Sequence, residues 1–221
     1  MKSSPRGSDV AASTEEGTVL IVDDDVDMCE GLSALFRSVG LQVEVFASAR
    51  DMLAFPLPDT ACCLVVDVRL PRLSGLDLQA QLRRSGVRVP IIFISGHGDV
   101  AMTVKAMKAG ASDFLTKPFR DQEILDAVTM ALERDRKRRT DEKGNLDMQA
   151  RFESLSPRER QVMAHVTNGL MNKQVAAKMG ISEKTVKIHR GQVMRKMHAK
   201  SLVDLVLIAE TLGIRTKSRS E

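Results

Sequence analysis

The sequence predicts an α/β domain built on a doubly wound, five-stranded parallel sheet, followed by a small all-α domain that contains a helix-turn-helix. Between residues 18 and 132, short apolar runs alternate with amphipathic segments, an order typical of a parallel sheet with helices on both faces. The later part of the chain contains helix caps and short helical periods. A chain of 221 residues is long enough to bury a core in both domains.

Apolar runs, and the residues that end them, set the elements of the first domain. Strands are predicted at 18–23, 42–46, 61–67, 91–95 and 113–116. Helices are predicted at 26–38, 48–55, 75–84 and 99–109, and from about 120 onward. Gly110 is expected to end the fourth helix, because glycine readily adopts the left-handed conformation that closes helices.

Capping residues delimit four helices in the second domain. Ser156, Ser182 and Ser201 each precede a helix, and Glu159 completes a capping box with Ser156. The four helices are expected to end near Asn168, Met179, Met197 and Leu212. The second and third of them, joined by the turn at 180–182, match the helix-turn-helix pattern.

Composition divides the chain into five parts. The ends, 1–17 and 216–221, are polar and are expected to form a flexible arm and a flexible tail. The α/β domain is expected to cover 18–132 and the helix-turn-helix domain 153–215. Between them, 133–152 is charged all round and is expected to be a linker with no residue to bury, whose first turns can be helical.

The distribution of charge points to nucleic acid as a partner of the second domain. Residues 151–221 carry 14 Lys and Arg against 6 Asp and Glu, whereas residues 1–150 carry 19 basic against 23 acidic residues. A basic C-terminal third behind an acidic front is typical of a chain whose tail binds nucleic acid. A solvated basic face without a partner is the alternative.

Apolar runs and cysteines indicate the compartment. The apolar runs are too short for a membrane-spanning helix, and residues 1–17 lack the apolar core of a signal peptide, so the chain is expected to be cytoplasmic, with no membrane partner. Cys29, Cys62 and Cys63 lack metal-ligand spacing. We expect them to be buried thiols in a reducing compartment.

Polar residues stand at the carboxyl ends of four predicted strands. Asp23 and Asp24 follow the first strand, Asp67 and Ser95 end the third and fourth, and Lys117 follows the fifth. Ligands bind at this edge of an open α/β sheet. The carboxylates can hold a divalent metal, the ammonium can hold a phosphoryl group, and Asp67 can act as the nucleophile that forms an acyl phosphate. Alternatively, an acid here simply caps a helix, and the lysine is solvated.

These residues resemble the receiver domain of two-component response regulators over about 18–132. The resemblance is carried by Asp23-Asp24, Asp67 with Pro71 and Gly75, Ser95-Gly96, and Lys117-Pro118-Phe119. It implies a flavodoxin-like fold with a Mg²⁺ site. The implied ligands are Asp24, Asp67 and the backbone carbonyl of Arg69, with Asp23 helping through water.

The same resemblance implies a phosphorylation switch. Asp67 is expected to accept a phosphoryl group from a phosphohistidine on a cognate sensor histidine kinase. Lys117 then contacts the phosphoryl oxygens, and the Ser95 hydroxyl moves to bond them. Phe114 is the implied rotating aromatic, without the hydroxyl of the tyrosine often found there. The Lys117–Pro118 bond is expected to be cis. The resemblance also implies that the residue at the position of Arg69, after the acceptor, tunes the rate at which the phosphoryl group is lost.

The third helix of the second domain has two unlike sides at about 100° per residue. The side expected to pack on the domain holds Val186, His189, Val193 and Met197. The opposite side holds Lys184, Lys187, Ile188, Gly191 and Arg195. A basic second helix in a helix-turn-helix suits the major groove of double-stranded DNA, and a solvated basic stripe is the alternative.

Residues 153–215 resemble the LuxR/NarL-type DNA-binding domain. The segments Leu155–Val162, Gly169–Ala176 and Ile181–Arg190 carry the resemblance, and Met194–Leu202 favours the FixJ branch. It implies contacts with bases or phosphates for Lys184, Thr185, Lys187, Ile188 and Arg190, and contacts with the DNA backbone for Asn172 and Lys173. Gly191 lies at a further contact position but offers no side chain there.

The fourth helix of this domain is apolar beyond one face. Leu202, Leu205, Val206 and Ala209 can face the core. Val203, Leu207 and Ile208 point elsewhere. This excess of apolar surface suggests a partner helix, and the resemblance implies a homodimer on DNA. Burial by the linker or by the first domain is the alternative.

Together these features predict a response regulator and not an enzyme. Phosphorylation of Asp67 would reshape the surface of 99–119, including Val104, Met107 and Lys108, and promote homodimerisation and binding to a double-stranded operator, with RNA polymerase as a further partner. A receiver that drains phosphate, with ungated DNA binding, is an alternative. An RNA-binding protein is disfavoured because the chain has no Trp or Tyr. A turnover enzyme is disfavoured because no His or Cys nucleophile with a partner is visible.

Overall fold

The computed structural model describes residues 17–96 and 100–214, which divide between two compact units, Met1–Arg139 and Thr140–Glu221. The predicted arm and tail lie outside the described residues, with the exception of Gly17. Gly17 is buried, and its carbonyl oxygen accepts a hydrogen bond from the backbone N–H of Gln42 at 3.0 Å. The prediction of a flexible arm was therefore wrong at Gly17, because backbone pairing begins one residue before the apolar run.

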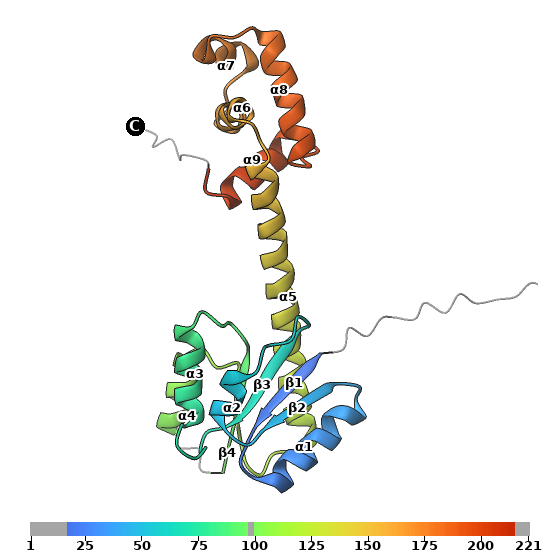
Figure 1. Cartoon of the computed structure of the whole chain (residues 1–221), viewed down its shortest axis with the longest axis vertical. Helices are drawn as coiled ribbons and strands as arrows, with labels where there is room; N and C mark the ends of the chain where they lie inside the picture. The colour runs from blue at the N-terminus through green and yellow to red at the C-terminus, as the bar shows by residue number, and fades with distance from the viewer. Residues whose placement is uncertain (1–16, 97–99, 215–221) are drawn as a thin grey trace, which may run out of the picture. The chain divides into compact units, whose positions relative to one another are not determined.

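The first unit contains the predicted five-stranded parallel sheet, in the order β2-β1-β3-β4-β5. Its strands β1, β2 and β3 lie side by side in Figure 1. Its strands are β1 (Thr18–Val22), β2 (Gln42–Phe46), β3 (Cys62–Asp67), β4 (Ile91–Ser95) and β5 (Asp113–Thr116). Its helices are α1 (Val26–Ser38), α2 (Ala49–Ala54), α3 (Gly75–Arg84), α4 (Val100–Lys108) and α5 (Asp121–Glu153). These bounds confirm the predicted elements to within a residue or two for the strands and first four helices, although Asp99, the expected start of the fourth helix, lies outside the described residues.

Helices cover both faces of this sheet. Along β1, Val19 and Ile21 point to the core that α1 and α5 cover, whereas Leu20 and Val22 point to the core that α2, α3 and α4 cover. Every residue of β1 is buried, as expected for a central strand whose successive side chains alternate between two covered faces. This arrangement leaves the carboxyl edge of the strands free for polar side chains.

The segment at 133–152 differs from its prediction. It is part of α5, which runs without interruption over 33 residues, and the side chain of Asp135 within it is fully buried. The prediction of a linker with nothing to bury was therefore wrong. A buried carboxylate held by neighbouring guanidinium groups leaves no apolar period in the sequence, so the pattern of charges resembles that of a solvated segment.

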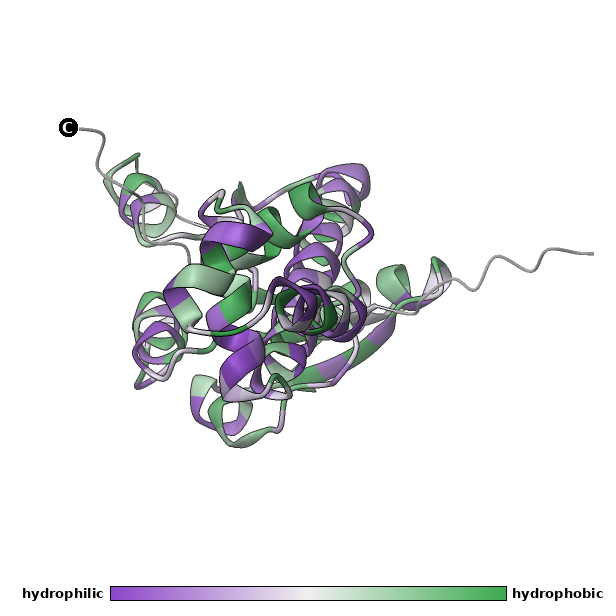
Figure 2. Ribbon diagram, turned by 90° about the horizontal axis from the view of Figure 1, so that it is seen from above, coloured by the Kyte–Doolittle hydropathy of each residue, from purple (hydrophilic) through white to green (hydrophobic). Residues whose placement is uncertain are grey.

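The second unit is helical. After the end of α5 it contains α6 (Pro157–Thr167), α7 (Asn172–Met179), α8 (Glu183–Lys196) and α9 (Leu202–Thr211), with a core of its own. The predicted caps are confirmed: Ser156, Ser182 and Ser201 each accept a hydrogen bond from the third residue of the helix that follows. Gly180 closes α7 in the left-handed conformation, which forms the turn of the helix-turn-helix. Hydrophilic and hydrophobic residues alternate along the helices, as amphipathic packing requires (Figure 2).

Helix α9 packs differently from its prediction at two residues. Leu205 and Ala209 are buried and Val203 and Leu207 are exposed, as predicted. Ile208, however, packs against the core, so its placement on the outer face was wrong. Leu202, expected to face the core, is 38% exposed. The outer apolar face of α9 is therefore Leu202, Val203 and Leu207.

Within the described residues, no helix combines the length and the apolarity needed to cross a lipid bilayer.

Candidate functional site

Polar side chains from the ends of β1, β3 and β5 meet at one edge of the sheet. The ammonium nitrogen of Lys117, just after β5, donates to Oδ2 of Asp67 at 2.7 Å and to Oδ2 of Asp23 at 2.9 Å. Asp23 is almost completely buried, whereas the Asp67 side chain retains 13% of its exposure. Two carboxylates thus share one cation, and one of them remains within reach of a reagent from solvent.

Burial and hydrogen bonds act in opposite directions on the pKa values of this pocket. Burial raises the pKa of the Asp23 carboxyl above its ordinary value, although the hydrogen bond from Lys117 opposes this. Burial alone would lower the pKa of Lys117, but the hydrogen bonds to Asp67 and Asp23 outweigh it and raise the pKa above its ordinary value of 10.5. Lys117 is therefore a permanent cation at neutral pH.

Backbone groups fix the orientation of Asp23 and Asp67. Oδ1 of Asp23 accepts a hydrogen bond from the N–H of Asp25 at 2.9 Å, and Oδ1 of Asp67 accepts one from the N–H of Arg69 at 2.7 Å. Asp25 itself caps α1, where its side chain accepts a hydrogen bond from the N–H of Met28 at 3.2 Å. Asp24 lies beside Asp23 and is exposed. Hydrogen bonds from the backbone thus hold both carboxylates in place.

Ser95 lies on β4, the strand next to that of Asp67, and Phe114 lies on β5, the next strand along. Ser95 ends β4 and is fully buried, and its carbonyl oxygen accepts a hydrogen bond from the N–H of Lys117 at 2.8 Å. Phe114 is half-buried on β5, with its ring centroid 6.3 Å from that of Phe93. The Lys117–Pro118 peptide bond is cis, as the resemblance implied. These residues connect the edge of the sheet to α4 and β5.

The donors at this edge are suited to Mg²⁺, which prefers oxygen ligands. The described residues contain no group of three or more His, Cys, Asp or Glu side chains gathered as a ready-made metal cage. Mg²⁺ does not require one, because it commonly binds one or two carboxylates and keeps several waters. Since Asp23 and Asp67 already stabilise a shared positive charge, the residues present fit this ion.

Gly75 packs directly under the Asp67 backbone, which gives a testable prediction. A Cβ atom at this position would lie 2.5 Å from the carbonyl oxygen of Asp67, and a backbone atom cannot rotate out of the way. Gly75→Ala is expected to lower the free energy of unfolding by about 1–3 kcal/mol in urea denaturation. Gly31→Ala is the control, because Gly31 lies in α1 and a Cβ atom added there would meet no atom of the described residues within 4 Å. This substitution should raise the free energy of unfolding by about 1 kcal/mol. Equal effects at the two positions would contradict this account.

Helix α8 presents the predicted basic side. Lys184, Lys187 and Ile188 are exposed, with Ile188 at 53% and the ammonium of Lys187 at 3.5 Å from Glu183. Gly191 is exposed in open space. Val186, Val193 and Met197 are buried on the opposite side as predicted, and His189 is half-buried. The amphipathic geometry of this helix is therefore confirmed.

Three of the residues expected to contact DNA make contacts within the protein. Arg190 donates to the side-chain oxygen of Asn172 at 3.1 Å, which links α8 to α7. The Thr185 hydroxyl lies 2.8 Å from that of Ser182, next to the helix cap. Lys173, at the start of α7, is exposed. Arg190 and Asn172 thus help to set the angle between the two helices of the helix-turn-helix.

Sequence reasoning missed a second link that positions α8. Oε2 of Glu159 accepts hydrogen bonds from Lys196 and from the N–H of Ser156, both at 2.7 Å, and Lys196 also donates to the carbonyl of Ser154 at 3.2 Å. The capping box was visible in the sequence. Its ion pair with a residue 37 positions later was not, because no periodicity marks such a pair.

This ion pair predicts a pH-dependent stability. Burial opposes ionisation of Glu159, but the hydrogen bonds from Lys196 and Ser156 outweigh it and lower the pKa below its ordinary value of 4.5. The pair therefore contributes stability above pH 4.5 and loses it as the pH falls through the lower, folded-state pKa. Glu159→Gln should cost about 2 kcal/mol at pH 7, since a hydrogen bond to a charged group is lost. The difference from wild type should shrink below pH 4.5.

Urea denaturation at several pH values measures this difference. Glu183→Gln is the control, because Glu183 is exposed and its pair with Lys187 is long. A cost for Glu159→Gln that stays constant from pH 7 to well below 4.5 would rule out the ion pair as its source.

The fold and the two sites define a class: a parallel α/β receiver domain joined to a helix-turn-helix DNA-binding domain. Residues 19–129 match the response regulator receiver domain, and residues 153–209 match the bacterial regulatory proteins of the luxR family. The chain belongs to the two-component response regulators with a LuxR-type DNA-binding domain. It is a transcriptional regulator and not an enzyme, as predicted.

Similar proteins agree with this assignment. Nodulation protein W of Bradyrhizobium diazoefficiens is 58% identical over 95% of this chain and 92% of that protein. The transcriptional regulatory protein FixJ of Azorhizobium caulinodans is 42% identical over 89% of this chain and 93% of that protein. The structure of the response regulator StyR matches 88% of this chain and 98% of that chain, with 45% identity and a TM-score of 0.81.

Proposed function

We propose that phosphorylation of Asp67 by a sensor histidine kinase gates dimerisation of this protein and its binding to a DNA operator. The observation that carries this proposal is the sharing of Lys117 between Asp67 and Asp23, at 2.7 and 2.9 Å. A cation held against a partly exposed carboxylate is the arrangement that an incoming phosphoryl group requires, because it offsets the repulsion between two anions.

In the phosphoryl transfer, an oxygen of the Asp67 carboxylate forms a bond to phosphorus as the bond from phosphorus to the histidine nitrogen of the kinase breaks. Lys117 neutralises the charge of the phosphoryl oxygens. Asp24, Asp67 and the carbonyl of Arg69 would hold Mg²⁺, with Asp23 acting through water, and the ion supplies further charge neutralisation.

The phosphoryl group then biases the switch residues. It adds about two negative charges at the end of β3, and the Ser95 hydroxyl moves to bond it. Phe114 turns inward on β5, and the surface of α4 changes with it. That surface exposes Val104 and Met107, each 43% exposed, and Lys108. Two receivers paired through these residues would form the phosphorylated homodimer.

Pairing of the receivers would place two α8 helices on the two halves of an operator. Lys184, Lys187 and Ile188 are the exposed residues of α8 that we assign to the major groove. Thr185 is a further contact at the helix start, Lys173 meets the DNA backbone, and Arg190 and Asn172 act at least partly by positioning. The outer face of α9, formed by Leu202, Val203 and Leu207, would pair the two DNA-binding domains. On DNA the dimer would act on RNA polymerase.

Titration of operator DNA with and without beryllofluoride, a stable mimic of the phosphoryl group, tests this function. The operator is first identified as the stretch of promoter DNA that the protein protects from DNase. Beryllofluoride with Mg²⁺ should raise the affinity and shift the protein to a dimer in sedimentation. Equal affinity in the two conditions, with a receiver that still accepts phosphate, would instead favour a phosphate-draining receiver with ungated DNA binding.

A further inference from the structure

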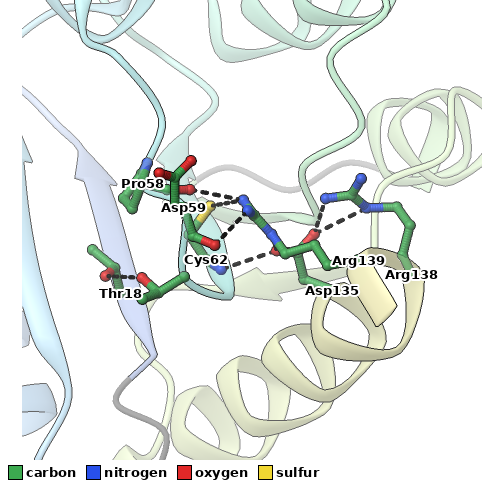
Figure 3. Close-up of polar contacts among 8 residues, drawn as sticks. Thr18, Pro58, Asp59, Cys62, Asp135, Arg138 and Arg139 are labelled. Carbon is green, nitrogen blue, oxygen red and sulfur yellow. Dashed lines mark hydrogen bonds and ion pairs between the residues drawn. The ribbon is translucent and has the colours of Figure 1, made fainter. Parts of the chain in front are cut away.

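A cluster of polar contacts joins α5 to the start of β3, five residues before Asp67 (Figure 3). Its centre is the fully buried carboxylate of Asp135. Oδ2 of Asp135 accepts from the N–H of Cys62 at 3.0 Å and from Nε of Arg139 at 2.6 Å. Oδ1 accepts from Nε of Arg138 at 3.1 Å and from its Nη2 at 2.6 Å. Both oxygens of the carboxylate are thus occupied.

Arg139 extends this cluster to the loop between α2 and β3. Its Nη1 donates to the carbonyl of Asp59 at 2.9 Å, and its Nη2 donates to the carbonyl of Pro58 at 3.0 Å and to Sγ of Cys62 at 3.6 Å (Figure 3). One guanidinium therefore binds α5 to the carbonyls of two consecutive residues, Pro58 and Asp59, and to the side chain of Cys62. We call Asp135, Arg138, Arg139 and their partners Pro58, Asp59 and Cys62 the Asp135 cluster.

The bonds of this cluster fix an orientation more than they add stability. The cost of removing charged groups from water offsets much of the attraction in a buried ion pair, and a well-packed apolar contact often stabilises a fold as well. Apolar contacts, however, permit sliding and rotation, whereas hydrogen bonds require a particular distance and direction. The bonds that leave α5, from the N–H of Cys62 to Asp135 and from Arg139 to the carbonyls of Pro58 and Asp59, therefore define the rotation of α5 about its own axis. The pairing of Asp135 with the two arginines lies within α5 and balances the charge of the buried carboxylate.

The Asp135 cluster lies just before the part of α5 that connects the two domains, so the rotation it fixes bears on that connection. It lies after the matched receiver segment ends at residue 129 and before the stretch 140–147, in which every residue is exposed. An exposed helical stretch of this length is marginal in water by itself, because helix nucleation is costly and propagation from existing helix is not. A firmly held turn just before it supplies the nucleus from which the helix propagates.

We propose that the Asp135 cluster makes the helix between the two domains a rigid continuation of the receiver, so that the state of the receiver is passed to the DNA-binding domain. Asp135 is thus a positioning residue for regulation, and this inference rests on the proposed function. The same strand, β3, carries the cluster at its first residue and Asp67 at its last. Without the cluster, the connecting segment would fray, and the two domains would be joined only by a flexible tether.

Two variants of the full chain test this inference. Asp135→Asn retains an oxygen for the N–H of Cys62 but removes the charge that holds both arginines. Arg139→Ala removes the contacts with Pro58 and Asp59 and leaves Asp135 paired with Arg138. Asp126→Asn is the matched control, since it is the same substitution on the same helix, at an exposed residue bonded to Gln122.

Two measurements are compared across these proteins. Hydrogen exchange of the backbone amides at 136–150 should be at least tenfold faster in Asp135→Asn and Arg139→Ala than in wild type and in the control. The ratio of operator affinities with and without beryllofluoride should fall to within about twofold of unity in both variants. Beryllofluoride binding to the receiver and operator affinity without it should be unchanged, which a general loss of folding would not allow.

The outcomes separate the two proposals. A wild-type affinity ratio of one would reject the proposed function itself. A wild-type ratio well above one that both cluster variants retain would overturn the role of the Asp135 cluster and leave the proposed function intact. Unchanged exchange at 136–150 in both variants would show that the cluster does not hold the helix, whatever the DNA measurements give. If Asp135→Asn does not fold, Arg139→Ala decides the matter alone.

Discussion

Asp67→Ala is expected to abolish the effect of phosphodonors and of beryllofluoride on DNA binding. The variant lacks the carboxylate oxygen that forms the bond to phosphorus, so no acyl phosphate can form. Couplings between sites in regulated proteins are typically about 1–3 kcal/mol. Phosphorylation should therefore raise the operator affinity of wild type by about 5- to 150-fold, and the variant should show no such increase. The measurement is operator titration of wild type and variant with and without beryllofluoride, together with labelling by a radioactive phosphodonor.

The pocket allows this substitution without loss of the fold. Lys117 keeps its ion pair with Asp23 at 2.9 Å, so no cation is left unpaired in a half-buried site. Circular dichroism should therefore match wild type. Asp27→Asn is the control, because Asp27 is an exposed acid in the first turn of α1, and it should respond to phosphodonor as wild type does. A base-labile phosphoryl label that persists in Asp67→Ala would show that another residue is the acceptor.

Periodicity explains why most of the fold could be predicted from the sequence. The strands β1, β3 and β4 are continuous apolar runs, because a central parallel strand is covered on both faces. The caps at Ser156, Ser182 and Ser201 could also be predicted, since each side chain accepts a hydrogen bond from a backbone N–H only three residues away. Strand patterns and helix caps depend on residues that are close together in the sequence.

Contacts between polar groups far apart in the sequence could not be predicted. The bond between Asp135 and Cys62 spans 73 positions, and that between Glu159 and Lys196 spans 37. In both, a residue that reads as solvated is buried by a partner on another element. Asn172 and Arg190 were predicted as DNA contacts from resemblance alone, and their mutual hydrogen bond was not anticipated. Ile208 was misplaced because the helix period alone does not show where neighbouring helices end.

The double substitution Lys184→Ala and Lys187→Ala is expected to weaken operator binding on the order of ten- to a hundredfold at physiological salt. Both side chains are exposed on α8, and Lys187 has only a long contact with Glu183. Each lysine bound to a phosphate releases a counterion, so the slope of log affinity against log salt should become shallower by about two for each bound subunit. Fluorescence anisotropy at several salt concentrations measures both quantities.

A variant with the same net charge separates local contacts from overall electrostatic attraction. Lys143→Ala with Lys200→Ala also removes two exposed cations, but Lys143 lies on α5 and Lys200 after the end of α8. Long-range attraction depends on total charge and falls off within about 8 Å at physiological salt, so this control should keep most of its affinity and its salt slope. Equal losses in the two double variants would mean that α8 is a solvated basic stripe and not the helix that enters the groove.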